Sequence, residues 1–211
     1  MSLISRIAFV LFAVMAIGIG LYPFMYVLND MTDGLLGSKS EELLGSIWYM
    51  PVFYGHILFG GVALLVGWSQ FSTKLRATRI QLHRNLGKTY AIMVTVSGLC
   101  GLILAYYATG GIITQLGFSV LGILWLFTTY KALTSVKQKK IVQHQFWMIR
   151  SFALCFAAVT LRIWLPVLIG GVGLEFIDAY KIVAWLCFVP NLIFAEVIIW
   201  WLQQPKALNF E

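Results

Sequence analysis

The sequence is short of charged residues, cysteines and histidines, and each shortage argues against a class of protein. Only 11% of its 211 residues are charged, whereas 60% are hydrophobic. A soluble domain carries about 25% charged residues, so this composition indicates an integral membrane protein. The three cysteines, Cys100, Cys155 and Cys187, form no CxxC motif and no paired framework. Neither a disulfide scaffold nor a zinc site is therefore expected.

Several catalytic and binding motifs are also missing from the sequence. It contains no glycine-rich phosphate loop, no carboxylate pair typical of a hydrolase and no Ser-His-Asp arrangement. The net charge of +7 could indicate a nucleic-acid partner, but no nucleic-acid motif is present and the basic residues are unevenly placed. The basic residues gather in segments that one topology places on a single side: Arg6, Lys74, Arg76, Arg79, Arg84, Lys88, Lys131, Lys137, Lys139, Lys140 and Lys206.

The opposite loops are acidic, and they carry Asp30, Asp33, Glu41, Glu42, Glu175 and Asp178. This asymmetry follows the positive-inside rule and predicts that both termini are cytoplasmic. Six apolar stretches are long enough to cross a bilayer, since a hydrocarbon core of about 30 Å needs roughly 20 residues per helix. These spans are expected at about 4–28, 51–71, 87–109, 112–134, 146–170 and 180–202.

Because the spans account for most of the chain, we expect residues 1–211 to form one all-α membrane domain, a six-helix bundle surrounded by lipid. Pro23 and Pro190 are expected to interrupt the first and last spans. A short surface helix is expected in the acidic loop before residue 50.

Two stretches of the chain follow the same plan. Each begins with a histidine and closes on a Gly-Gly pair, with 27 positions from His83 to Gly110 and 26 from His144 to Gly170. This similarity predicts two repeat units, at about 51–111 and 112–171, flanked by the first and last spans. Since both units enter the membrane from one side, the axis relating them should run along the membrane normal.

His83 and His144 begin parallel helices on the cytoplasmic side and should lie at a similar depth. Such a pair could hold one b-type haem by bis-histidine ligation. Arg79, Arg84 and Lys88 would then receive the haem propionates through charge-assisted hydrogen bonds. The alternative is that both histidines are ordinary interfacial residues without a ligand, because metal-type spacing such as HxxxH is absent.

Arg162 lies well inside an apolar segment, where a charge is costly and therefore indicates a functional site. If the fifth span is one continuous helix, Arg162 lies five turns and about 27 Å from His144. That places Arg162 at a depth comparable with His56 of the second span, and together they could bind an anionic ligand. The alternative is a structural arginine that binds helix-end carbonyls or reaches outward. One face of the fifth span would carry His144, Met148, Ser151, Cys155, Ala158 and Arg162.

Arg150 and Glu196 both lie in the inner halves of their spans. An ion pair between them would lower the cost of burying either charge, so we expect a structural pair.

The segments HRNLGKTY at 83–90 and HQFWMIRSFA at 144–153, followed by TLR at 160–162, resemble a family of small bacterial membrane proteins of unknown function. The resemblance covers about residues 50–170 and implies a bacterial inner-membrane location. The layout is also similar to cytochrome b561-type bundles, although three histidines allow at most one bis-histidine haem. The positions that match the family are His56, His83, Arg84, Gly87, Tyr90, His144, Met148, Arg150 and Arg162.

Three functions remain open from the sequence. The expected one is a redox membrane protein with one b-type haem between His83 and His144, exchanging electrons with quinone. The second is a non-catalytic assembly factor or partner subunit, in a complex with another membrane protein or with copies of itself. The third is a carrier or enzyme for an anionic lipid or small substrate, recognised by Arg162 and His56 from the outer side.

Overall fold

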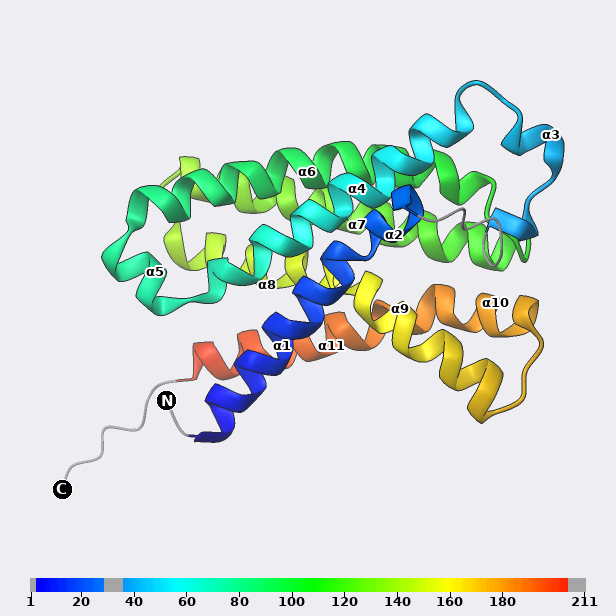
Figure 1. Cartoon of the computed structure of the whole chain (residues 1–211). Coiled ribbons are helices and arrows are strands. Elements are labelled where there is room, and N and C mark those ends of the chain that lie inside the picture. Colours follow the sequence, from blue (N-terminus) through cyan, green and yellow to red (C-terminus); the bar gives the residue numbers. More distant parts are fainter. Residues whose placement is uncertain (1–2, 29–35, 205–211) are drawn as a thin grey trace.

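The computed structural model describes residues 3–28 and 36–204, and every regular element in those ranges is a helix (Figure 1). The charges at Asp30, Asp33 and Lys206 lie outside the described residues. Six helical stretches are long and apolar enough to cross a membrane, which confirms the all-α, six-span prediction. They are Arg6–Tyr26, Tyr49–Phe71, Ile80–Tyr106, Ile112–Lys137, Ile141–Gly171 and Phe176–Gln203.

The first span is broken where proline was expected to break it. Helix α1 (Leu3–Leu21) ends two residues before Pro23, and α2 (Pro23–Leu28) follows after Tyr22. A short turn, η1 (Leu36–Ser38), and the surface helix α3 (Glu41–Leu44) follow. The hydroxyl of Ser40 accepts a hydrogen bond from the backbone N–H of Leu43 and so caps α3.

Two helical hairpins form the centre of the bundle. The first consists of α4 (Tyr49–Gly67), the turns η2 (Trp68–Phe71) and α5 (Thr73–Thr78), and α6 (Ile80–Tyr106). The second consists of α7 (Ile112–Lys137) and α8 (Ile141–Cys155). Helix α6 begins at residue 80 rather than at about 87, because its polar first two turns stay helical beyond the apolar segment that defines a span in sequence.

Tight turns join these helices at both ends. Gly110 and Gly111 have φ of 100° and 75°, a region that glycine enters without steric cost, and they join α6 to α7. Lys139, with φ of 60°, lies between α7 and α8.

The fifth span contains a break that the sequence did not predict. Helix α8 ends at Cys155, α9 (Ala157–Pro166) starts after Phe156, and a π-helical turn, η3 (Val167–Gly171), ends the span. The expectation of one continuous face from His144 to Arg162 is therefore wrong. The sixth span divides into α10 (Phe176–Leu186) and α11 (Val189–Gln203), as Pro190 predicted.

The two broken spans satisfy each other's free backbone groups. The side-chain amide of Asn191 in α11 donates to the carbonyl of Ala153 and to the hydroxyl of Thr160, at 3.1 Å each. The Thr160 hydroxyl in turn donates to the carbonyl of Cys187 at 2.5 Å. Carbonyls at a helix break lose regular partners, and in lipid no water replaces them. These side chains therefore hold both breaks in place.

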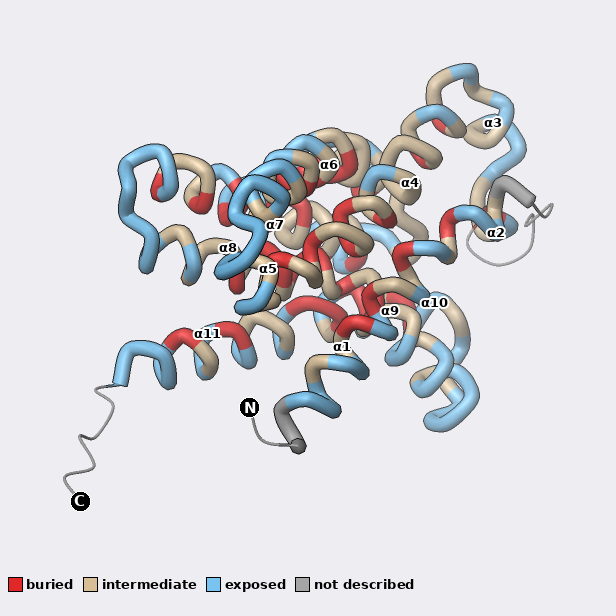
Figure 2. The backbone as a smooth tube through the Cα atoms, turned by 60° about the vertical axis from the view of Figure 1, so that its left-hand side comes forward, coloured by how far each residue is buried: buried red, intermediate tan, exposed pale blue. Residues whose placement is uncertain are grey.

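Helices α4, α6, α7 and α8 run side by side, α1 crosses α4, and α10 and α11 pack on α7 and α8 (Figure 1). The first turn of α1 and the last turn of α11 lie toward the end of the bundle that carries α5. We call this the basic end, because it holds the lysine- and arginine-rich connections before α6 and after α7. Buried residues line the inner faces of these helices (Figure 2).

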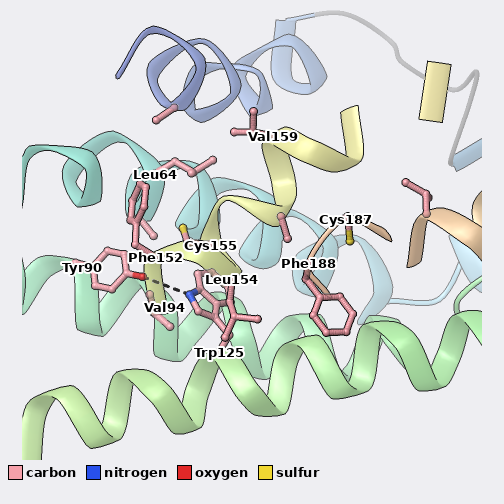
Figure 3. Packing of buried hydrophobic residues seen from close by; sticks show 14 of the residues in the cluster. Leu64, Tyr90, Val94, Trp125, Phe152, Leu154, Cys155, Val159, Cys187 and Phe188 are labelled. Atoms are coloured by element: carbon pink, nitrogen blue, oxygen red, sulfur yellow. Dashed lines mark hydrogen bonds between the residues drawn. The ribbon is translucent and has the colours of Figure 1, made fainter. Parts of the chain in front are cut away.

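The core centres on large side chains from four helices, among them Leu64, Tyr90, Trp125 and Phe152 (Figure 3). Tyr90 and Phe152 are 0% and 2% exposed. The same cluster extends to Val159 of α9 and Val183 of α10, and the bend at Phe156 carries α9 toward α1 (Figure 1).

Candidate functional site

A cavity of ≈ 480 Å³ lies in the half of the bundle away from the basic end. It lies where the bend at Phe156 directs α9 away from the line of α8 (Figure 1). Its volume is within the range of about 300–1,000 Å³ found for small-molecule sites. Helices α1, α4, α6, α7, α9 and α10 all contribute walls.

His56 of α4 lies in the wall of this cavity with its ring held against α6. Its Nδ1 is 2.9 Å from the carbonyl oxygen of Ser97, and the Ser97 hydroxyl donates to the carbonyl of His56 at 2.8 Å. A carbonyl oxygen only accepts hydrogen bonds, so Nδ1 carries the proton. The neutral ring therefore has a bare Nε2, and no hydrogen-bond partner for that nitrogen exists in the described part of the chain.

Two glycines allow α4 and α6 to approach closely enough for this contact. A Cβ atom at Gly101 would lie 2.9 Å from both Cε1 and Nδ1 of His56, and one at Gly60 would lie 2.9 Å from the Ser97 hydroxyl. Both distances are shorter than real carbon contacts. The orientation of the imidazole thus depends on glycine, which has no side chain, at both of these positions.

Arg162 of α9 lines the same cavity. One of its nitrogens donates to the carbonyl of Ala158 at 2.8 Å, and its guanidinium carbon lies 4.6 Å from the centre of the Tyr22 ring. A guanidinium has five N–H donors, and this carbonyl is the one acceptor that Arg162 has within the described residues. Neither ion pair of the described chain includes Arg162. Its charge is therefore held by a ring face and one carbonyl, without a neutralising carboxylate.

Lys39, from the turn before α3, reaches the mouth of the cavity. Its ammonium group donates to the carbonyl of Tyr107 and to the hydroxyl of Thr109. Partial burial lowers the pKa of Lys39 below its ordinary value, since removal from water disfavours the charged form. No aspartate or glutamate is found among the described residues of the cavity wall.

The cavity has a polar end and an apolar end. Lys39, His56 and Arg162 line the cavity together with the tyrosines Tyr22, Tyr26, Tyr49 and Tyr180. The deeper wall is apolar, and Figure 3 shows three of its residues, Trp125, Leu154 and Cys155, within the packed core. The remaining apolar wall includes Leu64, Leu121, Leu161 and Leu165.

His83 and His144, the expected haem ligands, lie in the first turns of α6 and α8 at the basic end. They are close enough to interact electrostatically. Nδ1 of His144 donates to the carbonyl of Ala132 at 2.9 Å, whereas Nδ1 of His83 is buried and has no partner among the described residues. Neither histidine lines the cavity described above. The expected propionate partners Arg79, Arg84 and Lys88 are exposed around them.

Arg150 and Glu196 form an ion pair between α8 and α11. Two guanidinium nitrogens of Arg150 lie 2.5 and 2.7 Å from the two carboxylate oxygens of Glu196. The guanidinium also lies over the ring of Trp147, 4.7 Å from its centre. The arrangement attaches α11 to the central hairpins and leaves the Arg150 charge compensated, in contrast to Arg162.

Sequence reasoning missed Lys39, Ser97, Gly101 and Asn191. Lys39 and Ser97 are polar residues without a recognisable motif, and their positions follow from contacts between distant segments. Asn191 did carry a signal, since it is a polar side chain directly after Pro190 in an apolar span.

The six apolar helices, with a cavity enclosed between them, define a multi-pass α-helical membrane protein. The chain belongs to the family described as predicted membrane protein (DUF2306), whose model matches residues 53–199. This match agrees with the family resemblance of the histidine-headed motifs. Comparison with curated proteins and with solved structures found no match.

Proposed function

We propose that the protein binds an anionic amphiphile in the cavity at Arg162 and His56. The observation that carries this proposal is the position of Arg162, a charged side chain that faces a cavity inside a membrane span and has no carboxylate partner in the described chain. A charge at such depth is costly unless it is paired. An anionic ligand would supply the missing partner through charge-assisted hydrogen bonds to the free N–H groups.

The rest of the cavity supports a ligand with one charged end and one apolar end. Lys39 adds a second cation at the mouth, and the absence of acidic residues from the described wall leaves no competing negative charge. The deeper wall of leucines, Trp125 and Cys155 suits a hydrocarbon chain. A carboxylate, phosphate or sulfonate on an acyl or alkyl chain has this distribution of polarity.

The family resemblance implies a bacterial inner membrane, and the positive-inside pattern supports cytoplasmic termini, so the cavity would open toward the outer leaflet. The ligand would then be a lipid or lipid-like molecule of that leaflet. Its binding would make the protein a carrier of, or an enzyme for, such molecules.

The test is ligand-dependent melting of the protein purified in a neutral maltoside detergent. Dodecyl phosphate should raise the melting temperature, since a ligand at a hundredfold excess over Kd adds about 2.7 kcal/mol to stability. Dodecylphosphocholine and dodecanol, of equal chain length but without net negative charge, should give little or no increase.

Arg162→Gln should weaken dodecyl phosphate binding by about tenfold or more, because the principal cation is removed. The matched control is Lys181→Gln, which also removes one positive charge from this half of the protein but at a position outside the cavity wall. Equal effects of the two substitutions, or equal stabilisation by all three amphiphiles, would rule out the site.

A haem-binding redox function is the second candidate, and one observation favours it. The Nδ1–H of His144 is held by a backbone carbonyl, which leaves Nε2 free, and His83 lies nearby. Histidines that ligate metals commonly donate their other N–H to such a carbonyl. A haem there would supply one-electron transfer, with quinone as the electron partner.

A reduced-minus-oxidised visible spectrum of the protein from haem-replete cells tests this candidate. A haem signal lost in both His83→Ala and His144→Ala would establish it. A flat spectrum would end it without affecting the proposal for the cavity.

A further inference from the structure

The accessible nitrogen of His56, Nε2, is a hydrogen-bond acceptor in the neutral ring and therefore repels an anion. Nδ1 donates to the Ser97 carbonyl, so in the neutral ring Nε2 is a lone-pair acceptor. This nitrogen belongs to a residue of the cavity wall, and it is not fully buried. A fully ionised head group placed between Arg162 and this lone pair would meet attraction on one side and repulsion on the other.

A proton removes the conflict. With a proton on Nε2, His56 becomes a cation that donates to the ligand while Nδ1 keeps its bond to Ser97. The backbone carbonyl accepts from Nδ1 in both states, so the ring does not need to turn. The same contact that fixes the tautomer therefore prepares the ring to accept a proton toward the cavity.

We infer that the cavity takes up one proton together with its anionic ligand, and that His56 holds it. This inference rests on the proposed function and deepens it, since it makes ligand binding proton-linked. A ligand that brings its own acidic proton, such as a phosphate monoester or a carboxylic acid, would share that proton with Nε2. A permanently ionised ligand would draw it from solvent.

The other ionisable groups near His56 limit what else could take up this proton. Arg162 of α9 stays charged, and the phenols and thiols around the cavity are uncharged at neutral pH in their ordinary forms. Lys39 at the mouth is the remaining group that could gain a proton. Cys100 lies beside Gly55, next to His56 in the chain, and the groups that line the cavity are Tyr22, Tyr26, Lys39, Tyr49, Cys155, Arg162, Tyr180 and Cys187.

The pH dependence has a definite sign. If the complex holds one proton more than the free protein, the ligand binds more tightly as pH falls. The apparent affinity should change by up to about tenfold per pH unit and level off once free His56 is itself protonated. An unlinked site with the same charges would give a flat profile.

The experiment is calorimetric titration with dodecyl sulfonate, whose head group stays ionised across this pH range. Titrations at about pH 7.5 in Tris and in HEPES, which differ in ionisation enthalpy, count the protons taken up, and the expected number approaches about one per ligand. His56→Gln places an amide donor near the Nε2 position but cannot titrate. It should bind dodecyl sulfonate with no proton uptake and with a flat pH profile.

Two further variants separate the possible origins of a negative result. His56→Asn keeps a donor near the Ser97 carbonyl and should also lose proton uptake, whereas Lys39→Gln should retain it. Loss of uptake in Lys39→Gln, or uptake that persists in both folded His56 variants, would overturn the assignment to His56. Binding of dodecyl sulfonate without proton uptake by the unmodified protein would overturn the linkage and leave the proposed function standing. If no anionic amphiphile binds at any pH, both proposals fail.

Discussion

The phenol oxygen of Tyr90 and the hydroxyl oxygen of Ser151 lie 2.8 Å apart, and each residue is seven positions after the histidine in the first turn of its helix. The contact therefore joins equivalent positions of the two histidine-headed segments. Thr129 lies 2.7 Å from the same serine, and the indole of Trp125 donates to Tyr90 at 3.4 Å. Contact between equivalent residues is what an axis between two repeat units requires, although the repeat itself stays a prediction.

Ser151 is the shared member of this network, so its loss should cost more than loss of an isolated hydroxyl. Ser151→Ala should lower the free energy of unfolding by about 1–2 kcal/mol, because both Tyr90 and Thr129 lose a buried partner. Thr95→Ala is the control, since the exposed hydroxyl of Thr95 bonds only within its own helix. Equal melting temperatures for the two variants would show that the network contributes nothing.

Asn191 should contribute as much to the free energy of unfolding as an apolar core residue, although it is polar. Asn191→Ala removes two hydrogen bonds and takes a donor from the carbonyl of Ala153, so we expect a loss of about 1–3 kcal/mol. Thermal unfolding in detergent measures it. Asn85→Ala, at an exposed position near the start of α6, should have little effect.

Gly101 should tolerate no side chain. In Gly101→Ala the new methyl group would lie 2.9 Å from the His56 ring, so either the ring or α6 must move, at about 1–3 kcal/mol. Gly18→Ala is the matched substitution, because no atom lies within 4 Å of its added carbon. Melting curves should separate the two, and a stable Gly101→Ala protein with an undisturbed His56–Ser97 contact would contradict the packing described above.

Glu196 stabilises the attachment of α11. Glu196→Gln keeps the shape of the side chain but removes the charge that compensates Arg150. The free energy of unfolding should fall by roughly 1 kcal/mol or more, and the melting temperature should fall with it. Arg150→Gln should behave similarly, and the double variant should be less unstable than the sum of the two. Unchanged melting of Glu196→Gln would show that the pair has no structural role.

Much of the fold was predictable, because the length of an apolar segment and the position of a proline act locally. The six spans follow from the bilayer thickness, and Pro23 and Pro190 mark their breaks since proline lacks an N–H. The break at Phe156 has no such local cause. It depends on Asn191 from another span and on the Phe12 ring stacked 5.3 Å from Phe156, contacts that one segment's sequence does not reveal.

The candidate site was predictable only in part. His56 and Arg162 were placed at similar depth by counting from the span ends, and both line one cavity. The tautomer of His56 and the reach of Lys39 depend on tertiary contacts, which residue spacing does not encode. Haem binding, a quinone partner, a partner subunit and self-association stay predictions.

The bend at Phe156 makes the two hairpins unequal along their length. Near the basic end, α6 and α8 have matching roles and meet through equivalent side chains. At the level of Phe156, α6 continues as one unbroken helix, whereas α8 ends and α9 turns away from its line. Because α9 leaves the line of α8, its Arg162 faces the cavity from a side wall, and a polar group enters the bundle interior without any helix being added.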